Sequence, residues 1–186
     1  MRDTRTELLI QAEALVRGRG YAGFSYADLA AVVGIRKASI HHHFRTKEDL
    51  GAALVAAYEE RYDEALAAIR AAHADGLARV EAYGRLYLSG VEQGLGCLCA
   101  ALAIEGEALP ERLRRDIVRF FERHIAWLEE VLREGQAKGE IRASLDPAVQ
   151  ARFVVSTLEG ALLMERLLAG PRAFEGTLRA LAESLR

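Results

Sequence analysis

Cysteine and proline are scarce in this chain of 186 residues, which has only two cysteines, Cys97 and Cys99, and three prolines. Two thiols cannot build the disulfide framework of a small secreted domain, so we expect a reducing compartment. With few prolines, long segments are free to be helical, because a proline in a helix interior costs about 3 kcal/mol.

Long hydrophobic runs and a net positive charge are also lacking. The longest apolar stretch, residues 97–104, is far shorter than the roughly 20 residues that cross a bilayer. The charged N-terminal residues do not resemble a signal peptide, so we expect a cytoplasmic protein without membrane contact. The 25 basic and 27 acidic side chains give a formal charge of −2. That balance excludes a uniformly basic coat for nucleic acid.

Helix-forming residues dominate what is present. Apolar residues recur at a spacing close to 3.6, and glycines, prolines and capping residues divide the chain into about nine helical pieces. Ser25 with Asp28 predicts one helix start, and Thr46 with Asp49 predicts the start of a long helix that ends near Asp75 and Gly76. The predicted fold is all-α: a three-helix N-terminal module, joined by a long fourth helix to a C-terminal helical bundle.

Residues 25–44, SYADLAAVVGIRKASIHHHF, carry the pattern of a helix-turn-helix, with the tight turn at Gly34. Between Gly34 and Lys47 there are four cations and no acidic residue. A local positive patch on a slightly acidic chain is what binding to the phosphates of double-stranded DNA requires. The second helix of this motif is the one expected to enter the major groove.

The string GIRKASIHHHFRTKEDL, residues 34–50, resembles the signature of the TetR/AcrR family of transcriptional regulators, which usually has an aromatic residue at the position of His41. The resemblance implies a DNA-binding domain over residues 1–47 and a ligand-binding and dimerisation domain over residues 48–186. The positions that would meet DNA are Ser25, Tyr26, Arg36, Lys37, Ser39, His41, His42 and Lys47.

The hypothesis is therefore a ligand-responsive regulator, a repressor that binds a palindromic operator as a homodimer and is released by a small hydrophobic effector. One short recognition helix reads few bases, and two copies spaced by one DNA turn match a palindrome. The last two helices form the predicted dimer interface, because apolar and small residues recur on one face of each. Its residues are Phe153, Thr157, Gly160, Met164, Phe174, Leu178 and Leu181.

A ligand pocket is predicted in the C-terminal bundle, because two phenols, an imidazole and an indole in one bundle all need hydrogen-bond partners. The predicted lining is Tyr83, Tyr87, Cys97, Cys99, Ile104, Phe121, His124 and Trp127. The nearest charges are expected to be Glu105, Glu107 and Arg119, so an apolar and a cationic effector both fit the sequence.

Alternative functions remain open at this point. Cys97 or Cys99 could act as a sensor of oxidants or electrophiles, or the chain could be a helical small-molecule-binding protein without a regulatory role on DNA. No enzyme motif or cofactor motif is supported, and His41–His43 lack metal-ligand spacing. Gly18, Gly20 and Gly23 spell GxGxxG, but they follow a predicted helix rather than a strand, so they do not predict a dinucleotide site.

Overall fold

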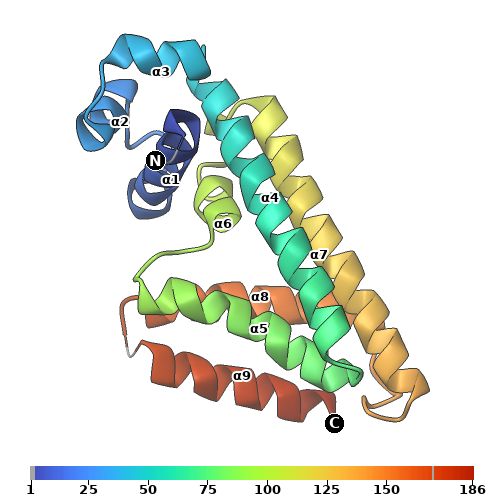
Figure 1. The fold of residues 1–186 in the computed structure, drawn as a ribbon. Helices are drawn as coiled ribbons and strands as arrows, with labels where there is room; N and C mark the ends of the chain where they lie inside the picture. Colours follow the sequence, from blue (N-terminus) through green and yellow to red (C-terminus); the bar gives the residue numbers. More distant parts are fainter. Residues whose placement is uncertain (1–2, 169) are drawn as a thin grey trace. The chain divides into compact units, whose positions relative to one another are not determined.

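The computed structural model describes residues 3–168 and 170–186. Within these ranges the chain has nine α-helices, one short 3-10 turn and no strand (Figure 1). The elements are α1 (Thr4–Arg19), α2 (Tyr26–Val33), α3 (Lys37–His43), α4 (Lys47–Ala72), α5 (Gly76–Glu92), α6 (Leu98–Ala103), η1 (Gly106–Ala108), α7 (Glu111–Ala137), α8 (Pro147–Glu165) and α9 (Pro171–Leu185). The prediction of an all-α fold is confirmed.

The predicted capping residues define the helix-turn-helix locally. The Ser25 hydroxyl accepts the backbone N–H groups of Ala27 and Asp28, while the Asp28 carboxylate accepts the Ser25 N–H at 2.7 Å. These hydrogen bonds with Ser25 lower the pKa of Asp28. Gly34 ends α2 with φ +76°, in the left-handed region that favours glycine. The start of α2 and the turn that follows it are therefore fixed by residues that can be recognised in the sequence.

The contacts divide the chain into two compact units. The N-terminal unit comprises the chain up to Arg61 together with Leu98–Arg119, and the C-terminal unit comprises Tyr62–Cys97 and Phe120–Arg186. Helices α4 and α7 contribute residues to both. The predicted division places every residue after 47 in the second domain. The observed N-terminal unit instead includes α6, because α6 packs against α1.

The core of the N-terminal unit fixes α3 from behind. Leu8 of α1, Leu29 of α2, Ile40 of α3 and Leu50 of α4 each have no exposed surface. Burying side chains of this size stabilises by about 1.5–3 kcal/mol each. Ile40 is the only buried residue of α3, His43 is half-buried, and the other five side chains of this short helix are exposed.

In the C-terminal unit, α5, α8 and α9 lie side by side (Figure 1). Gly84 of α5 permits the close approach of α9, because a Cβ there would lie 2.3 Å from Cδ1 of Leu178. Phe174 and Leu185 of α9 have no exposed surface. The last helix is therefore part of the core of this unit.

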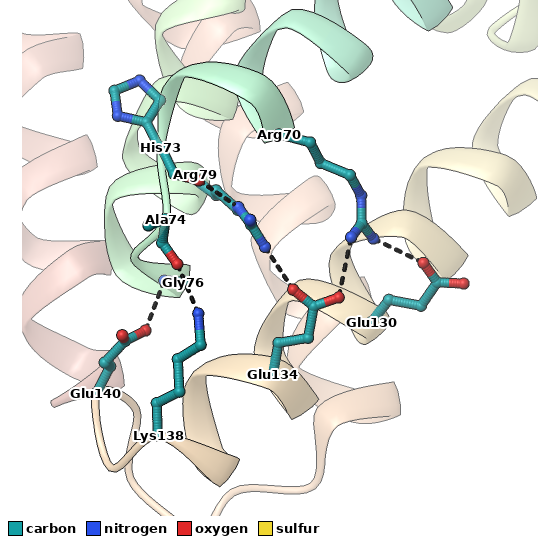
Figure 2. Close-up of polar contacts among 9 residues, drawn as sticks. All are labelled: Arg70, His73, Ala74, Gly76, Arg79, Glu130, Glu134, Lys138 and Glu140. Carbon is teal, nitrogen blue, oxygen red and sulfur yellow. Dashed lines mark hydrogen bonds and ion pairs between the residues drawn. The ribbon is translucent and has the colours of Figure 1, made fainter.

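A polar cluster fastens the turn between α4 and α5 to the end of α7 (Figure 2). The Glu134 carboxylate accepts hydrogen bonds from both Arg70 and Arg79, and these contacts, led by Arg70, lower the pKa of Glu134. Next to it, Glu140 accepts the backbone N–H of Gly76 at 2.6 Å, and Lys138 donates to a carbonyl of the turn. The cluster holds three helix ends together in the C-terminal unit.

One predicted boundary was wrong. Helix α4 ends at Ala72, earlier than expected. Asp75 instead begins the next helix, where its side chain accepts the backbone N–H of Ala78 at 2.7 Å. An aspartate satisfies the unpaired N–H groups at a helix start, which is why it caps α5 rather than ending α4.

Candidate nucleic-acid interface and buried polar cluster

The exposed side of α3 carries most of the predicted DNA-binding residues. Arg36 is the N-cap of α3 and Lys37 its first residue, and Ser39, His41 and His42 follow on the same helix. All five side chains are exposed. The structure thus brings together two cations and three polar side chains on one short, anchored helix.

Tyr26 lies behind this helix rather than on its exposed side. Its side chain is 6% exposed, and its hydroxyl is shared between the carbonyl oxygens of Phe44 at 3.1 Å and Thr46 at 2.5 Å. Burial, with a smaller contribution from the charge of Asp49, raises the pKa of Tyr26 to about 12. The ring of His41 packs edge-on against Tyr26 at 4.9 Å. Tyr26 therefore holds the end of α3 in place, unlike the direct DNA contact that the sequence predicted.

Lys47 also turns inward. Its ammonium group donates to the carbonyl oxygens of Tyr21 and Phe24 and lies over both aromatic rings, at 4.6 and 4.3 Å from their centroids. Partial burial lowers the pKa of Lys47, and the negative charges of Glu105 and Asp28 raise it by a smaller amount. Ser25 is exposed but is engaged in capping α2. Of the eight predicted contacts, the five on or next to α3 are exposed, and one of these, His41, also packs against Tyr26 and places its Nδ1 3.1 Å from the carbonyl oxygen of Arg45.

The C-terminal unit contains a buried polar cluster formed by part of the predicted pocket. The Tyr83 hydroxyl lies 3.1 Å from the Tyr87 hydroxyl and 3.0 Å from Nδ1 of His124. Burial raises the pKa of both phenols well above 10 and lowers that of His124 to about 4. Trp127 stacks on Tyr83, with ring centroids 5.8 Å apart. His124 is therefore neutral at physiological pH.

Glu159 also belongs to this cluster, although it is not among the pocket residues predicted from the sequence. Its carboxylate accepts hydrogen bonds from the side chains of Cys97 and Tyr87, yet burial is the larger effect and raises its pKa to about 7. Its Oε1 atom is buried without a hydrogen-bond partner among the residues that the structure describes. The signal in the sequence was that Glu159 is the only acidic residue between Asp146 and Glu165, in a helix that otherwise reads as apolar.

The remaining predicted pocket residues are spread more widely. Phe121 is half-buried beside Phe120, and Cys97 is buried within the cluster. Cys99 is buried in the N-terminal unit, to which Ile104 also belongs, 77% exposed.

The three charges predicted to be nearest the pocket, Glu105, Glu107 and Arg119, belong to the N-terminal unit. Glu105 accepts the backbone N–H of Ala22, and Arg119 pairs with Glu59 at 3.4 Å, all within the N-terminal unit. Hydrogen bonding to Glu59 is the main cause of the raised pKa of Arg119. Within the C-terminal unit, Glu159 adjoins the buried phenols, and the charge of Asp63 acts on His124.

The predicted dimer residues separate into two groups. Phe153 and Met164 on α8 are 50% and 55% exposed, and Thr157 and Gly160 between them are half-buried, with no atom within 4 Å of a Cβ built at Gly160. The α9 residues, by contrast, are enclosed within the C-terminal unit. Phe174, Leu178 and Leu181 are 0%, 5% and 4% exposed. Their side chains are used inside the unit, so the apolar surface lies on α8.

Two other features are absent from residues 3–168 and 170–186. Within these ranges, no group of three or more His, Cys, Asp or Glu side chains is arranged to hold a metal ion. No helix there has the length and hydropathy needed to span a membrane.

An all-helical chain that presents a cationic, exposed helix of a helix-turn-helix belongs to the class of DNA-binding regulators. The chain matches two protein families: "Bacterial regulatory proteins, tetR family" over residues 8–54, and "Tetracyclin repressor-like, C-terminal domain" over residues 76–181. The chain belongs to the TetR family of transcriptional regulators, and it is a DNA-binding regulator rather than an enzyme.

Individual relatives agree with this assignment. The HTH-type transcriptional repressor NemR of Escherichia coli (strain K12) is 30% identical over 187 residues, which cover 97% of this chain and 91% of the relative. The crystal structure of the reduced form of E. coli NemR matches with a TM-score of 0.86 and 26% identity, covering 100% and 98% of the two chains. A TetR-family regulator from Agrobacterium tumefaciens matches with a TM-score of 0.92 and 32% identity, covering 97% and 96%.

Proposed function

We propose that the protein is a dimeric repressor that binds a palindromic operator through α3 and releases it when a small molecule binds in the C-terminal unit. The observation that carries the proposal is the exposed side of α3, anchored from behind by Ile40 and Tyr26. A relative that is 30% identical over 97% of this chain is named as a transcriptional repressor, which supports the same sign of regulation here.

The contacts proposed with DNA fall into two kinds. Arg36 and Lys37 stand at the start of α3, where cations neutralise phosphates, and Arg36 also has the fork geometry that reads guanine. Ser39, His41 and His42 supply short polar groups for base edges. We assign no phosphate contact to Lys47, because its ammonium group already meets two backbone carbonyls.

The proposed dimer contact is the apolar face of α8. Phe153 and Met164 are about half exposed, and Gly160 between them leaves space for a close approach of a second helix. Exposed apolar side chains gathered on one helix face are typical of a surface that is covered by another protein. A second copy of this chain is the occupant that a palindromic operator requires.

The proposed effector site is the buried polar cluster around Tyr83. Its aromatic rings favour a hydrophobic small molecule, and the Glu159 carboxyl group adds a polar anchor that suits a hydrogen-bond donor or a cation. A ligand that binds one arrangement of the protein better than another shifts the population between them. Coupling of about 1–3 kcal/mol changes operator affinity about 5–150-fold, which suffices for induction.

The test is DNA binding measured by fluorescence anisotropy, with labelled fragments that flank the protein's own gene and a panel of hydrophobic and cationic compounds. We expect saturable binding by the wild type that at least one compound relieves. Lys37→Ala should weaken binding to all fragments. It should also reduce the slope of log affinity against log salt concentration by about one in magnitude. Arg172→Ala, which removes an exposed cation from α9, is the matched control and should leave both quantities unchanged. Absence of binding at any salt concentration would refute the proposal.

A second candidate is a sensor of electrophiles that acts through Cys97. The observation that favours it is the position of the thiol, which is 4% exposed and hydrogen-bonds to Glu159 within the proposed effector site. A reagent such as N-ethylmaleimide forms a carbon–sulfur bond with the thiol and takes its proton on the ring carbon. If this function holds, N-ethylmaleimide should release DNA from the wild type and from Cys99→Ser but not from Cys97→Ser. Release from Cys97→Ser would exclude it.

A further inference from the structure

The turn between α1 and α2, residues 20–24, is held from outside by two side chains of opposite charge. Both carboxylate oxygens of Glu105 accept the backbone N–H of Ala22, at 3.1 and 3.0 Å. The ammonium group of Lys47 donates to the carbonyl oxygens of Tyr21 and Phe24. An anion therefore meets an amide of the turn, and a cation meets its carbonyl groups.

The backbone shape of the turn makes this approach specific. Gly20 has φ +81°, and a Cβ at this position would lie 2.7 Å from Oε1 of Glu105. At Gly23 a Cβ would lie 2.1 Å from the carbonyl oxygen of Arg19. Side chains larger than glycine would thus displace either the carboxylate or the turn, so the sequence G-Y-A-G fits the contact with Glu105.

The position of this contact links it to the DNA-binding surface. The turn ends at Phe24, and the next residue, Ser25, is the N-cap that sets where α2 begins. Glu105 is 83 residues away from Ala22 and follows directly after α6, which packs against α1. A segment outside the helix-turn-helix therefore fixes the entry into it.

We propose that Glu105 is a positioning residue for operator binding, which acts by holding the α1–α2 turn, and with it the start of α2, in the arrangement that α3 needs on DNA. The effect of Glu105 on operator affinity rests on the proposed function, because it requires that the protein binds an operator. The contact itself can be measured on the free protein. Glu105 touches no DNA in this proposal and acts through Ala22.

The experiment compares Glu105→Ala and Glu105→Gln with the wild type, using Glu107→Ala as the matched control. Glu107 is an exposed glutamate of η1, two residues further along. The first readout is hydrogen exchange of the Ala22 amide, followed by NMR on the free protein. The second is operator affinity by anisotropy. Because this hydrogen bond is exposed to water, we assign it the net contribution of an ordinary hydrogen bond, which corresponds to about a five-fold change in an equilibrium constant.

We expect Glu105→Ala to speed exchange at Ala22 and to weaken operator binding about five-fold. Glu105→Gln retains an acceptor oxygen and should restore both quantities to within about two-fold of the wild type. Glu107→Ala should match the wild type throughout. Glu105→Gln removes the negative charge but keeps the acceptor, so normal binding by this variant would show that the hydrogen bond matters. A general effect of negative charge on DNA binding would appear in Glu107→Ala as well.

The possible failures are distinguishable. Equal exchange at Ala22 in the wild type and Glu105→Ala would overturn the proposal, as would faster exchange with unchanged operator affinity. If the wild type binds no operator fragment, the proposed function fails, and the positioning role fails with it. The exchange arm would then report only whether the hydrogen bond forms.

Discussion

The Tyr83 hydroxyl lies 3.0 Å from Nδ1 of His124, and this contact determines which ring nitrogen of the histidine carries the proton. Tyr83 has a single proton to donate and two partners, His124 and Tyr87. When Glu159 is ionised, Tyr87 donates to its carboxylate, so Tyr83 must donate to Tyr87. The hydroxyl oxygen of Tyr83 is then the acceptor that His124 faces, and the proton is on Nδ1.

The first prediction is therefore the Nδ1–H tautomer of His124 at pH 8. At that pH the imidazole, with its pKa lowered by burial to about 4, is neutral, and Glu159, with a pKa near 7, is mostly ionised. Two-bond ¹H–¹⁵N spectra of protein labelled at histidine distinguish the tautomers, and the signals that disappear in His124→Gln identify this ring. An Nε2–H tautomer at pH 8 would contradict the hydrogen-bond direction.

The second prediction concerns stability against pH. Glu159 has a pKa raised from 4.5 to about 7, so its contribution to the free energy of unfolding is present below pH 4.5 and is lost as pH rises through 7. His124 has a pKa lowered from 6.5 to about 4, so its contribution is present above pH 6.5 and is lost as pH falls through 4. Between pH 4.5 and 6.5 the two slopes oppose each other and cancel.

Single variants should reveal each slope. Relative to the wild type, Glu159→Gln should gain about 3 kcal/mol in free energy of unfolding as pH rises from 4.5 to 7, since one pKa unit corresponds to about 1.4 kcal/mol. As pH rises from 4 to 6.5, the free energy of unfolding of His124→Phe should fall by a similar amount relative to the wild type. Urea unfolding at fixed protein concentration measures both. A difference that does not change with pH would show that the group titrates normally in the folded protein.

Much of the helix-turn-helix could be predicted because its signals are local. Ser25 with Asp28 and the left-handed Gly34 lie within a few residues of the helix ends that they define, and cap geometry depends on such neighbours. The exposure of His42 follows in the same way, because it lies two residues after the buried Ile40 and therefore about 200° around α3 from it.

Other features could not be predicted because they depend on partners that are distant in the sequence. Lys47 is part of a strongly basic segment, and only the folded turn 20–24 shows that its charge points inward. The sequence predicted Glu105 as a charge near the pocket, whereas in the structure its carboxylate accepts the backbone N–H of Ala22. The α9 residues have the same apolar spacing whether they face a second copy or, like Leu178, the adjacent α5. A periodic pattern identifies a buried face but not the element that buries it.

The third prediction tests the apolar face of α8. Phe153→Arg should convert a dimer into a monomer in analytical ultracentrifugation, because a charge at the centre of an apolar contact loses its hydration without gaining a partner. Val118→Arg is the matched control, since Val118 is 53% exposed against 50% for Phe153 but lies on α7 in the N-terminal unit. A dimer that survives Phe153→Arg would place the interface elsewhere.

The fourth prediction concerns Gly76, the first residue of α5, beside the polar cluster of Figure 2. A Cβ there would lie 2.9 Å from Cα of Gly135 and 3.1 Å from the carbonyl oxygen of Val131, both backbone atoms of α7. Backbone of a packed helix cannot move aside as a side chain can, so Gly76→Ala should lower the free energy of unfolding by about 1–3 kcal/mol.

Gly18 is the matched control for that substitution. It lies inside α1, and a Cβ at this position would meet no atom within 4 Å. Alanine is favoured over glycine by about 1 kcal/mol in a helix interior and by less in the last turn, where Gly18 lies, so Gly18→Ala should stabilise the protein or leave its stability unchanged. Urea unfolding of the two variants measures the contrast. Equal stability of Gly76→Ala and Gly18→Ala would mean that α5 and α7 can separate at this point without cost, and that the contacts of Glu140 and Lys138 with the turn do not hold the two helices together.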